Sequence, residues 1–195
     1  MIDFKKEMKL NKLLIVMVSK KNYNDKILEI TKGVSDTKPL SYVSLNKPYT
    51  LINKKLKNLG VNTDNFLYID TLTKEKSKEN ANVLHMSSPR ALVELNVNIS
   101  KALEIGNVKK IIFDSLSTLL VYEKPKCVVK FIHALSAKLR VLGVTAIFII
   151  LKEDTLPDFL KNLYMFADKV IDLSEEKSEK IGSENIKINS AQEEK

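Results

Sequence analysis

The sequence predicts an α/β domain in which a doubly wound, mainly parallel sheet carries helices on both faces. Short apolar runs alternate with stretches of helical periodicity as far as residue 173 of the 195, and this alternation favours parallel strands joined by right-handed crossovers. The longest apolar run, at residues 144–151, is typical of a strand buried on both faces. A chain of this length buries a sufficient core as one domain without disulfides or metals.

The predicted strands and helices follow one another in strict order. The strands are short apolar runs at residues 13–18, 40–45, 66–69, 111–113, 144–151 and 170–173. Between them, apolar residues recur three and four positions apart, which predicts amphipathic helices. These helices are expected from 22 or 24 to 34, and over 48–60, 88–106, 125–143 and 156–167. Proline near the start and glycine near the end bound several of them.

Polar segments flank this alternating region. Residues 1–12 are expected to form an N-terminal extension, residues 13–173 the domain, and residues 174–195 a polar C-terminal tail. A short edge strand is predicted at 185–189 within that tail. The stretch 71–82 lacks apolar periodicity and predicts a mobile loop.

The composition argues against several classes of protein. The lone Cys127 cannot form an internal disulfide, and two distant histidines do not suit a zinc site. No stretch approaches the roughly 20 apolar residues that cross a bilayer, and the first residues lack the apolar core of a signal peptide. We therefore expect a cytoplasmic protein without a membrane partner.

The net charge of +8 raises the hypothesis of nucleic-acid binding. Only Arg90 and Arg140 among the 32 basic residues are arginines, whereas recognition of phosphates and bases favours the guanidinium group. The candidate lysines are Lys54, Lys55 and Lys57 in a predicted helix, and Lys74, Lys76 and Lys78 in the predicted loop. Because no aromatic residues are interleaved with them, stacking on bases is unsupported.

Three segments carry a resemblance to a known family. They are KIIFDSLS at 110–117, GVTAIFII at 143–150 and FADKVIDL at 166–173. In this order they resemble the Walker B strand, the next core strand and the strand entered through an aspartate in RecA-like ATPases, in particular the KaiC-like branch common in archaea and cyanobacteria. The resemblance implies a three-layer RecA-like (P-loop NTPase-like) fold over about 13–173, with an ATP site beyond the carboxyl ends of the strands.

The phosphate-binding loop that this resemblance implies has no recognisable counterpart. A P-loop needs glycine-rich backbone that wraps its N–H groups around phosphates, a lysine on those phosphates, and a Ser or Thr on magnesium. The segment SKKNYND at 19–25 stands in that place and contains no glycine. Lys20 and Lys21 are the remaining candidates for a phosphate site, and the alternative is a solvated lysine pair.

The paired catalytic glutamates of KaiC-like enzymes are also replaced. The segment YVSLNK at 42–47 resembles the strand end that carries them, and by this alignment Asn46 and Lys47 take their positions. Neither an amide nor a cation acts as a carboxylate general base. The sequence therefore predicts a degenerate ATP site with no catalytic residue.

Four further residues are candidates for a remnant site. Asp114, followed by Ser115, resembles the Walker B end, where the carboxylate of working relatives holds magnesium through water. Its alternative role is the N-cap of the residues that follow, with Ser115 and Ser117 assisting. Asp70 either lines the same cleft or caps its own loop. Arg90 is a candidate because relatives place arginines at subunit clefts to meet phosphates.

Three functions remain open at this point. The first is a non-catalytic regulatory or scaffolding domain that needs no ATP or magnesium and acts through contacts with protein partners or with itself. The alternative is an atypical nucleotide binder that holds phosphate through Lys20, Lys21 or Arg90, and magnesium through Asp114. Non-specific nucleic-acid binding through the lysine clusters is the third.

Overall fold

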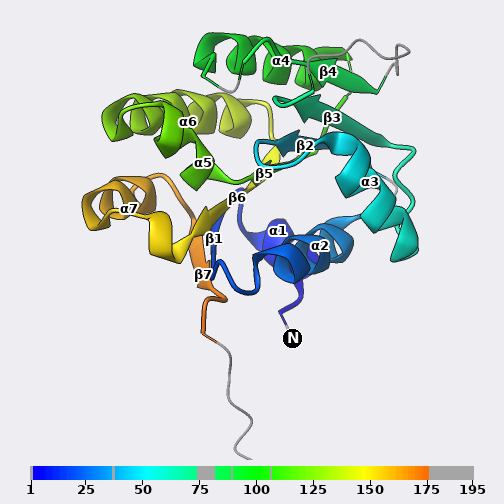
Figure 1. Ribbon diagram of the computed structural model, residues 1–195, viewed down its shortest axis with the longest axis horizontal. Coiled ribbons are helices and arrows are strands. Elements are labelled where there is room, and N and C mark those ends of the chain that lie inside the picture. The colour runs from blue at the N-terminus through cyan, green and yellow to red at the C-terminus, as the bar shows by residue number, and fades with distance from the viewer. Residues whose placement is uncertain (1, 37, 74–81, 89, 106, 176–195) are drawn as a thin grey trace, which may run out of the picture.

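Seven strands form one sheet in the computed structural model, in the order β4-β3-β2-β5-β6-β1-β7 (Figure 1). The structure describes residues 2–36, 38–73, 82–88, 90–105 and 107–175. The strands are β1 (Leu13–Val18), β2 (Leu40–Ser44), β3 (Phe66–Asp70), β4 (Val83–His85), β5 (Lys110–Asp114), β6 (Thr145–Leu151) and β7 (Lys169–Asp172). Every strand pairing in the described residues is parallel. All carboxyl ends therefore meet at one edge of the sheet.

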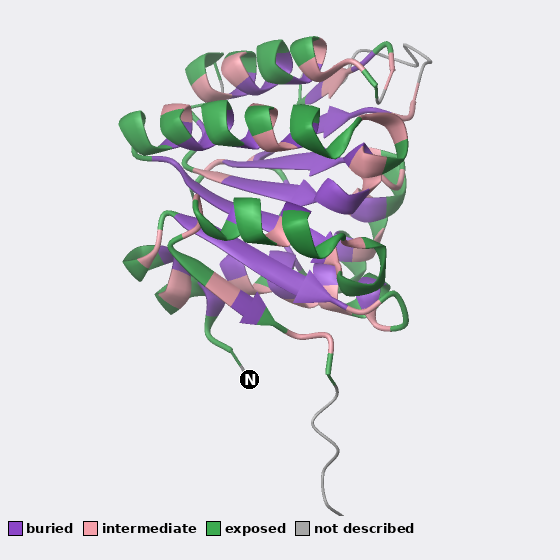
Figure 2. Cartoon of the chain, turned by 90° about the vertical axis from the view of Figure 1, so that its left-hand side faces the viewer, coloured by how far each residue is buried: buried purple, intermediate pink, exposed green. Residues whose placement is uncertain are grey.

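Helices cover both faces of this sheet. One face carries α1 (Phe4–Leu10), α2 (Tyr23–Val34) and α3 (Tyr49–Asn58), and the other carries α4 (Leu92–Ile105), α5 (Leu116–Tyr122), α6 (Pro125–Val141) and α7 (Pro157–Tyr164). Figure 2 shows the buried strands between helices whose outward sides are exposed. This arrangement confirms the predicted three-layer α/β fold with a parallel, doubly wound sheet.

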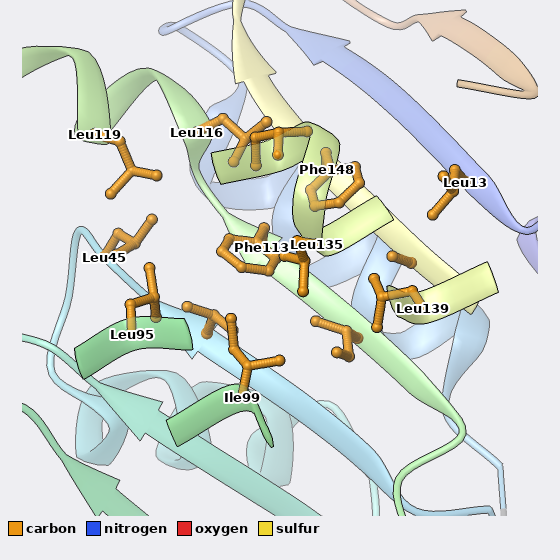
Figure 3. Packing of buried hydrophobic residues seen from close by; sticks show 14 of the residues in the cluster. Leu13, Leu45, Leu95, Ile99, Phe113, Leu116, Leu119, Leu135, Leu139 and Phe148 are labelled. Atoms are coloured by element: carbon orange, nitrogen blue, oxygen red, sulfur yellow. The ribbon is translucent and has the colours of Figure 1, made fainter. Parts of the chain in front are cut away.

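Each face of the sheet buries its own hydrophobic core because successive strand residues point to opposite sides. In β1, Leu13 packs toward α6 and α7, whereas Leu14 packs toward α1 and α2. On the first of these faces Phe113 lies 5.3 Å from Phe148, ring centre to ring centre, and Figure 3 shows leucines of α4 and α6 around them. Each such buried side chain contributes roughly 1.5–3 kcal/mol.

The N-terminal segment differs from its predicted role. Residues 1–12 were expected to lie outside the domain, but α1 packs against α2 and buries Phe4 and Met8 in the core. Asp3 caps this helix by accepting a hydrogen bond from the Lys6 backbone at 3.0 Å. The helix has only seven residues, too few to show a clear apolar period, so the folded domain begins earlier than predicted.

Other boundaries agree closely with the predicted ones, with three differences. The helix predicted from residue 88 begins at Leu92, because Ser88 instead accepts the backbone N–H groups of Arg90 and Ala91 in a turn. The three-residue strand β4 and the seven-residue helix α5 were not predicted at all. Most of the predicted loop at 71–82, and the edge strand at 185–189, lie outside the described residues. In the described part of the chain, no helix is long and apolar enough to cross a lipid bilayer.

Candidate functional site

A buried carboxyl lies at the carboxyl end of the central strand β5. Asp114 is fully inaccessible to solvent, and its two oxygens accept hydrogen bonds from different tyrosines. The Tyr42 hydroxyl, on the neighbouring strand β2, donates to Oδ2 at 2.5 Å. The Tyr23 hydroxyl, from the first residue of α2, donates to Oδ1. The chain thus brings the ends of β2 and β5 and the start of α2 together on a single carboxyl group.

Burial shapes the protonation of this group. Loss of solvation raises the pKa of Asp114 to about 8, while the two donated hydrogen bonds favour the ionised form. Burial also raises the pKa of Tyr42 well above its usual value, so its hydroxyl keeps its proton. The raised pKa therefore favours the protonated form of Asp114 near neutral pH.

Asn46 and Lys47 both lie in this cluster, as their place after β2 predicts. The Asn46 Nδ2 donates to the Tyr23 hydroxyl at 2.8 Å, and its Oδ1 accepts from the Thr118 hydroxyl of α5. The Lys47 ammonium donates to the Asn24 side chain and lies 5.4 Å from the centre of the Tyr23 ring. Burial lowers the pKa of Lys47. Together these contacts tie the start of α2 to the end of β2.

Lys20 and Lys21 lie in the turn that joins β1 to α2, and Lys20 is held by acids of the same chain. Its ammonium pairs with Asp154 at 2.5 Å, which raises the pKa of Lys20, and its backbone N–H lies 3.1 Å from both oxygens of the Glu153 carboxylate. Lys21 is exposed. The structure does not bring Arg90 to this turn: its guanidinium lies 5.8 Å from the centre of the Tyr122 ring, at the end of α5.

Asp70 is buried, and its side chain caps the loop that follows β3. Its carboxylate accepts hydrogen bonds from the backbone of Leu72 and Thr73, from the Thr73 hydroxyl, and from the backbone of Tyr49 at the start of α3. Of the two roles that the sequence allows, this geometry supports the cap.

The predicted alternative role of Asp114 as an N-cap is wrong. The chain passes from β5 through a cis peptide bond between Asp114 and Ser115 into α5, and Ser115 is the N-cap residue, without a side-chain capping bond. The hydroxyl of Ser117 accepts the backbone N–H of Leu151 instead. Asp114 turns toward the tyrosines because its side chain points to the α2 and α3 face of the sheet.

A family model described as the ATPase KaiC matches residues 30–190. The chain belongs to the KaiC ATPase family. Similar solved structures are known from archaea, and at 13–16% identity they share the fold with this KaiC-family chain. Curated proteins gave no match.

Three of these solved structures illustrate the likeness. A KaiC-like protein from Pyrococcus horikoshii has a TM-score of 0.60 and 13% identity, covering 86% of this chain and 74% of its own. An uncharacterized protein from the same organism, in complex with an unknown peptide, has a TM-score of 0.58 and 16% identity, covering 88% and 84%. The flagellar accessory protein FlaH from Methanocaldococcus jannaschii has a TM-score of 0.55 and 14% identity, covering 83% and 70%.

The sequence interpretation missed the two tyrosines that hold Asp114. An aromatic residue in a strand, such as Tyr42, ordinarily indicates core packing. Tyr23 belongs to the glycine-free segment 19–25, and a bulky residue at that position was the available signal. No group of three metal-ligating side chains occurs among the residues that the structure describes.

Proposed function

We propose that this KaiC-family domain is a non-catalytic regulatory or scaffolding protein that acts through protein contacts. The observation that carries the proposal is the Asp114 carboxyl, fully buried with both oxygens hydrogen-bonded to Tyr23 and Tyr42. A carboxylate that holds magnesium through water needs an oxygen open to that water. Here tyrosine hydroxyls take that place, and the raised pKa of Asp114 disfavours the charge that would attract a cation.

The β1–α2 turn supports the same proposal. Only residues 19–22 separate the two elements, and none of them is glycine. A phosphate in this position would need free backbone N–H groups, but Glu153 already accepts the N–H of Lys20, and Asp154 neutralises its ammonium. The residues present therefore do not fit a magnesium–ATP complex bound in the manner of a P-loop.

The positions of the catalytic glutamates give a third line of support. Asn46 and Lys47 use their polar atoms within the cluster, where Asn46 binds Tyr23 and Thr118, and Lys47 binds Asn24. Neither side chain accepts a proton from water at neutral pH. The contacts that Asn46 and Lys47 make are structural, because they join α2, α5 and the end of β2.

A contact surface is available on α4 and α6, the helices on the far side of the sheet from this cluster. An apolar groove of about 500 Å³ runs between them and is lined by Leu103, Glu104, Ala137, Lys138, Val141 and Leu142. Of its lining residues, Val141 is 86% exposed and Leu142 is 50% exposed. Large apolar side chains gathered at one exposed place are typical of surfaces that bind protein. We call this surface the α4–α6 groove.

The proposal predicts that the protein associates through the α4–α6 groove. Sedimentation velocity of the purified protein is expected to show a dimer or larger species at micromolar concentration. Placing a charge in the groove with Val141→Glu should shift the protein toward the monomer, because burial of a carboxylate in an apolar contact is costly. The matched control is Val121→Glu, since Val121 is 75% exposed on α5 and outside the groove.

Two results would contradict this prediction. One is a protein that sediments as a monomer at every concentration tested. The other is equal dissociation by Val141→Glu and Val121→Glu, which would place the contact outside the groove.

A further inference from the structure

A lysine-rich pocket opens at the edge of the sheet opposite Asp114. Its volume is about 680 Å³, and it lies where the amino ends of β1, β2, β5 and β6 meet α1. Strand β5 joins the two places, since it begins at Lys110 in the pocket and ends at Asp114. Six lysines line it: Lys5, Lys9, Lys12, Lys38, Lys109 and Lys110. We call it the six-lysine pocket.

The positive charge of the pocket is poorly compensated within it. Asp36 is the one carboxylate among the described lining residues, and it pairs with Lys110 at 2.5 Å. Glu7 of α1, which stands between Lys5 and Lys9 in the sequence, accepts instead from Lys169 at 2.7 Å. The described lining residues therefore carry an excess of five positive charges.

Backbone groups offset only part of this excess. The Lys110 ammonium also donates to the Val34 carbonyl at the end of α2, at 2.8 Å. The Lys12 ammonium lies 3.5 Å from the Gly143 carbonyl. Lys5, Lys9 and Lys109 remain exposed at the mouth of the pocket. Such a cluster repels itself and lowers stability unless an anion joins it.

The arrangement contrasts with the other lysines of this chain. Several lysines elsewhere have an acidic partner, as Lys20 has Asp154 and Lys26 has Glu29. Solvated helix faces are also usually convex, whereas these six side chains surround a concavity. The convergence of four strand ends and one helix on a hollow lined by cations indicates a site for an anion of high charge density.

The lining residues indicate which anion fits. Lysine ammonium groups are compact point charges that suit phosphate oxygens without demanding planar, bidentate geometry. Each phosphate carries up to about two negative charges near neutral pH, so a short chain of phosphates balances the pocket. None of the described lining residues is aromatic, which disfavours a single-stranded nucleic acid held by base stacking.

We propose that the six-lysine pocket binds a compact polyphosphate, either as a free inorganic chain or as the phosphates of a small molecule. The size of the pocket is within the range of about 300–1,000 Å³ that small ligands occupy. The site is independent of the degenerate nucleotide site, because it lies at the other edge of the sheet. Magnesium is expected to weaken binding here, since it neutralises the phosphates that the lysines attract.

Calorimetric titration of the full chain with inorganic tripolyphosphate, without magnesium, tests the proposal. The wild type should bind with an affinity that falls steeply as salt rises. The variant Lys9→Glu with Lys109→Glu should bind at least about tenfold more weakly, a loss of about 1.4 kcal/mol or more. The matched control is Lys54→Glu with Lys57→Glu on exposed positions of α3, which changes the net charge equally and should bind like the wild type.

Further measurements distinguish a nucleotide from an inorganic polyphosphate and show whether the variants fold. The milder variant Lys9→Gln with Lys109→Gln should also lose affinity, and its melting curve shows whether it folds. If ATP without magnesium binds more tightly than tripolyphosphate, the ligand is assigned as a nucleotide. If the two bind with equal affinity, the ligand is assigned as the inorganic chain. The proposal is overturned if millimolar tripolyphosphate does not bind, if both charge-reversal variants lose affinity equally, or if a single-stranded oligonucleotide binds this pocket more tightly than tripolyphosphate does.

Discussion

Asp114→Asn is expected to remove a fall in stability that the wild type shows as pH rises. The pKa of Asp114 is raised by burial from 3.8 to about 8 in the folded protein. Between these values the folded state holds a proton that the unfolded chain has released, so the free energy of unfolding decreases with pH. This contribution is fully present below pH 4 and is lost as pH passes through 8. Its upper limit is about 6 kcal/mol, because each unit of pKa difference corresponds to about 1.4 kcal/mol.

Chemical unfolding across pH 5 to 9 measures this effect. The free energy of unfolding of Asp114→Asn should rise steadily relative to that of the wild type as pH increases, because asparagine does not titrate. Asp70→Asn is the matched control, since Asp70 is equally buried but accepts backbone N–H groups. It should be less stable than the wild type, because an amide nitrogen would face those donors. Parallel pH profiles for Asp114→Asn and the wild type would contradict the buried-acid interpretation.

The double variant Tyr23→Phe with Tyr42→Phe is expected to lose about 2–4 kcal/mol of stability at pH 7. Both oxygens of Asp114 would lose their donors, and Asn46 would lose the hydroxyl that accepts its amide hydrogen. A buried polar group without a partner retains its full desolvation penalty. Adding Asp114→Leu should restore much of the loss, because it removes the polar group that was left unpaired.

Denaturant unfolding of the wild type, the double variant and the triple variant tests this expectation. Tyr164→Phe is the control for loss of a hydroxyl, because Tyr164 is 42% exposed and makes a single weak contact, at 3.6 Å to the Met17 sulfur. It should change stability by less than about 0.5 kcal/mol. A triple variant that is less stable than the double variant would show that Asp114 is stabilised by groups other than the two tyrosines.

Much of the fold could be predicted because the local composition of a strand indicates whether it is buried. The six residues of β1 are all apolar and all buried, and the long helix α6 repeats its buried residues three and four positions apart. The elements that were missed or misassigned are α1, α5 and β4, which have seven, seven and three residues. In segments that short, periodicity carries too little information, and packing against α2 or β3 decides the structure.

The site was predicted only in part, for a different reason. Asp114 and Asn46 were recognised through the resemblance of their segments to the Walker B strand and to the glutamate-bearing strand end of KaiC-like ATPases. The contact of Tyr23 with Asp114 spans 91 positions of sequence. It depends on the order of the strands and on where α2 begins, and neither is encoded in the residues around Tyr23. Local patterns therefore identified the carboxyl group of Asp114 but not the tyrosines that donate hydrogen bonds to it.

We propose that tyrosine hydroxyls take the place of magnesium and nucleotide at Asp114. Calorimetric titration with ATP, with and without magnesium, tests it most directly, using the wild type and Asp114→Ala. The account predicts that magnesium does not strengthen the binding of ATP, and that Asp114→Ala leaves any binding that occurs unchanged. Binding of ATP that requires magnesium and disappears in Asp114→Ala would contradict it.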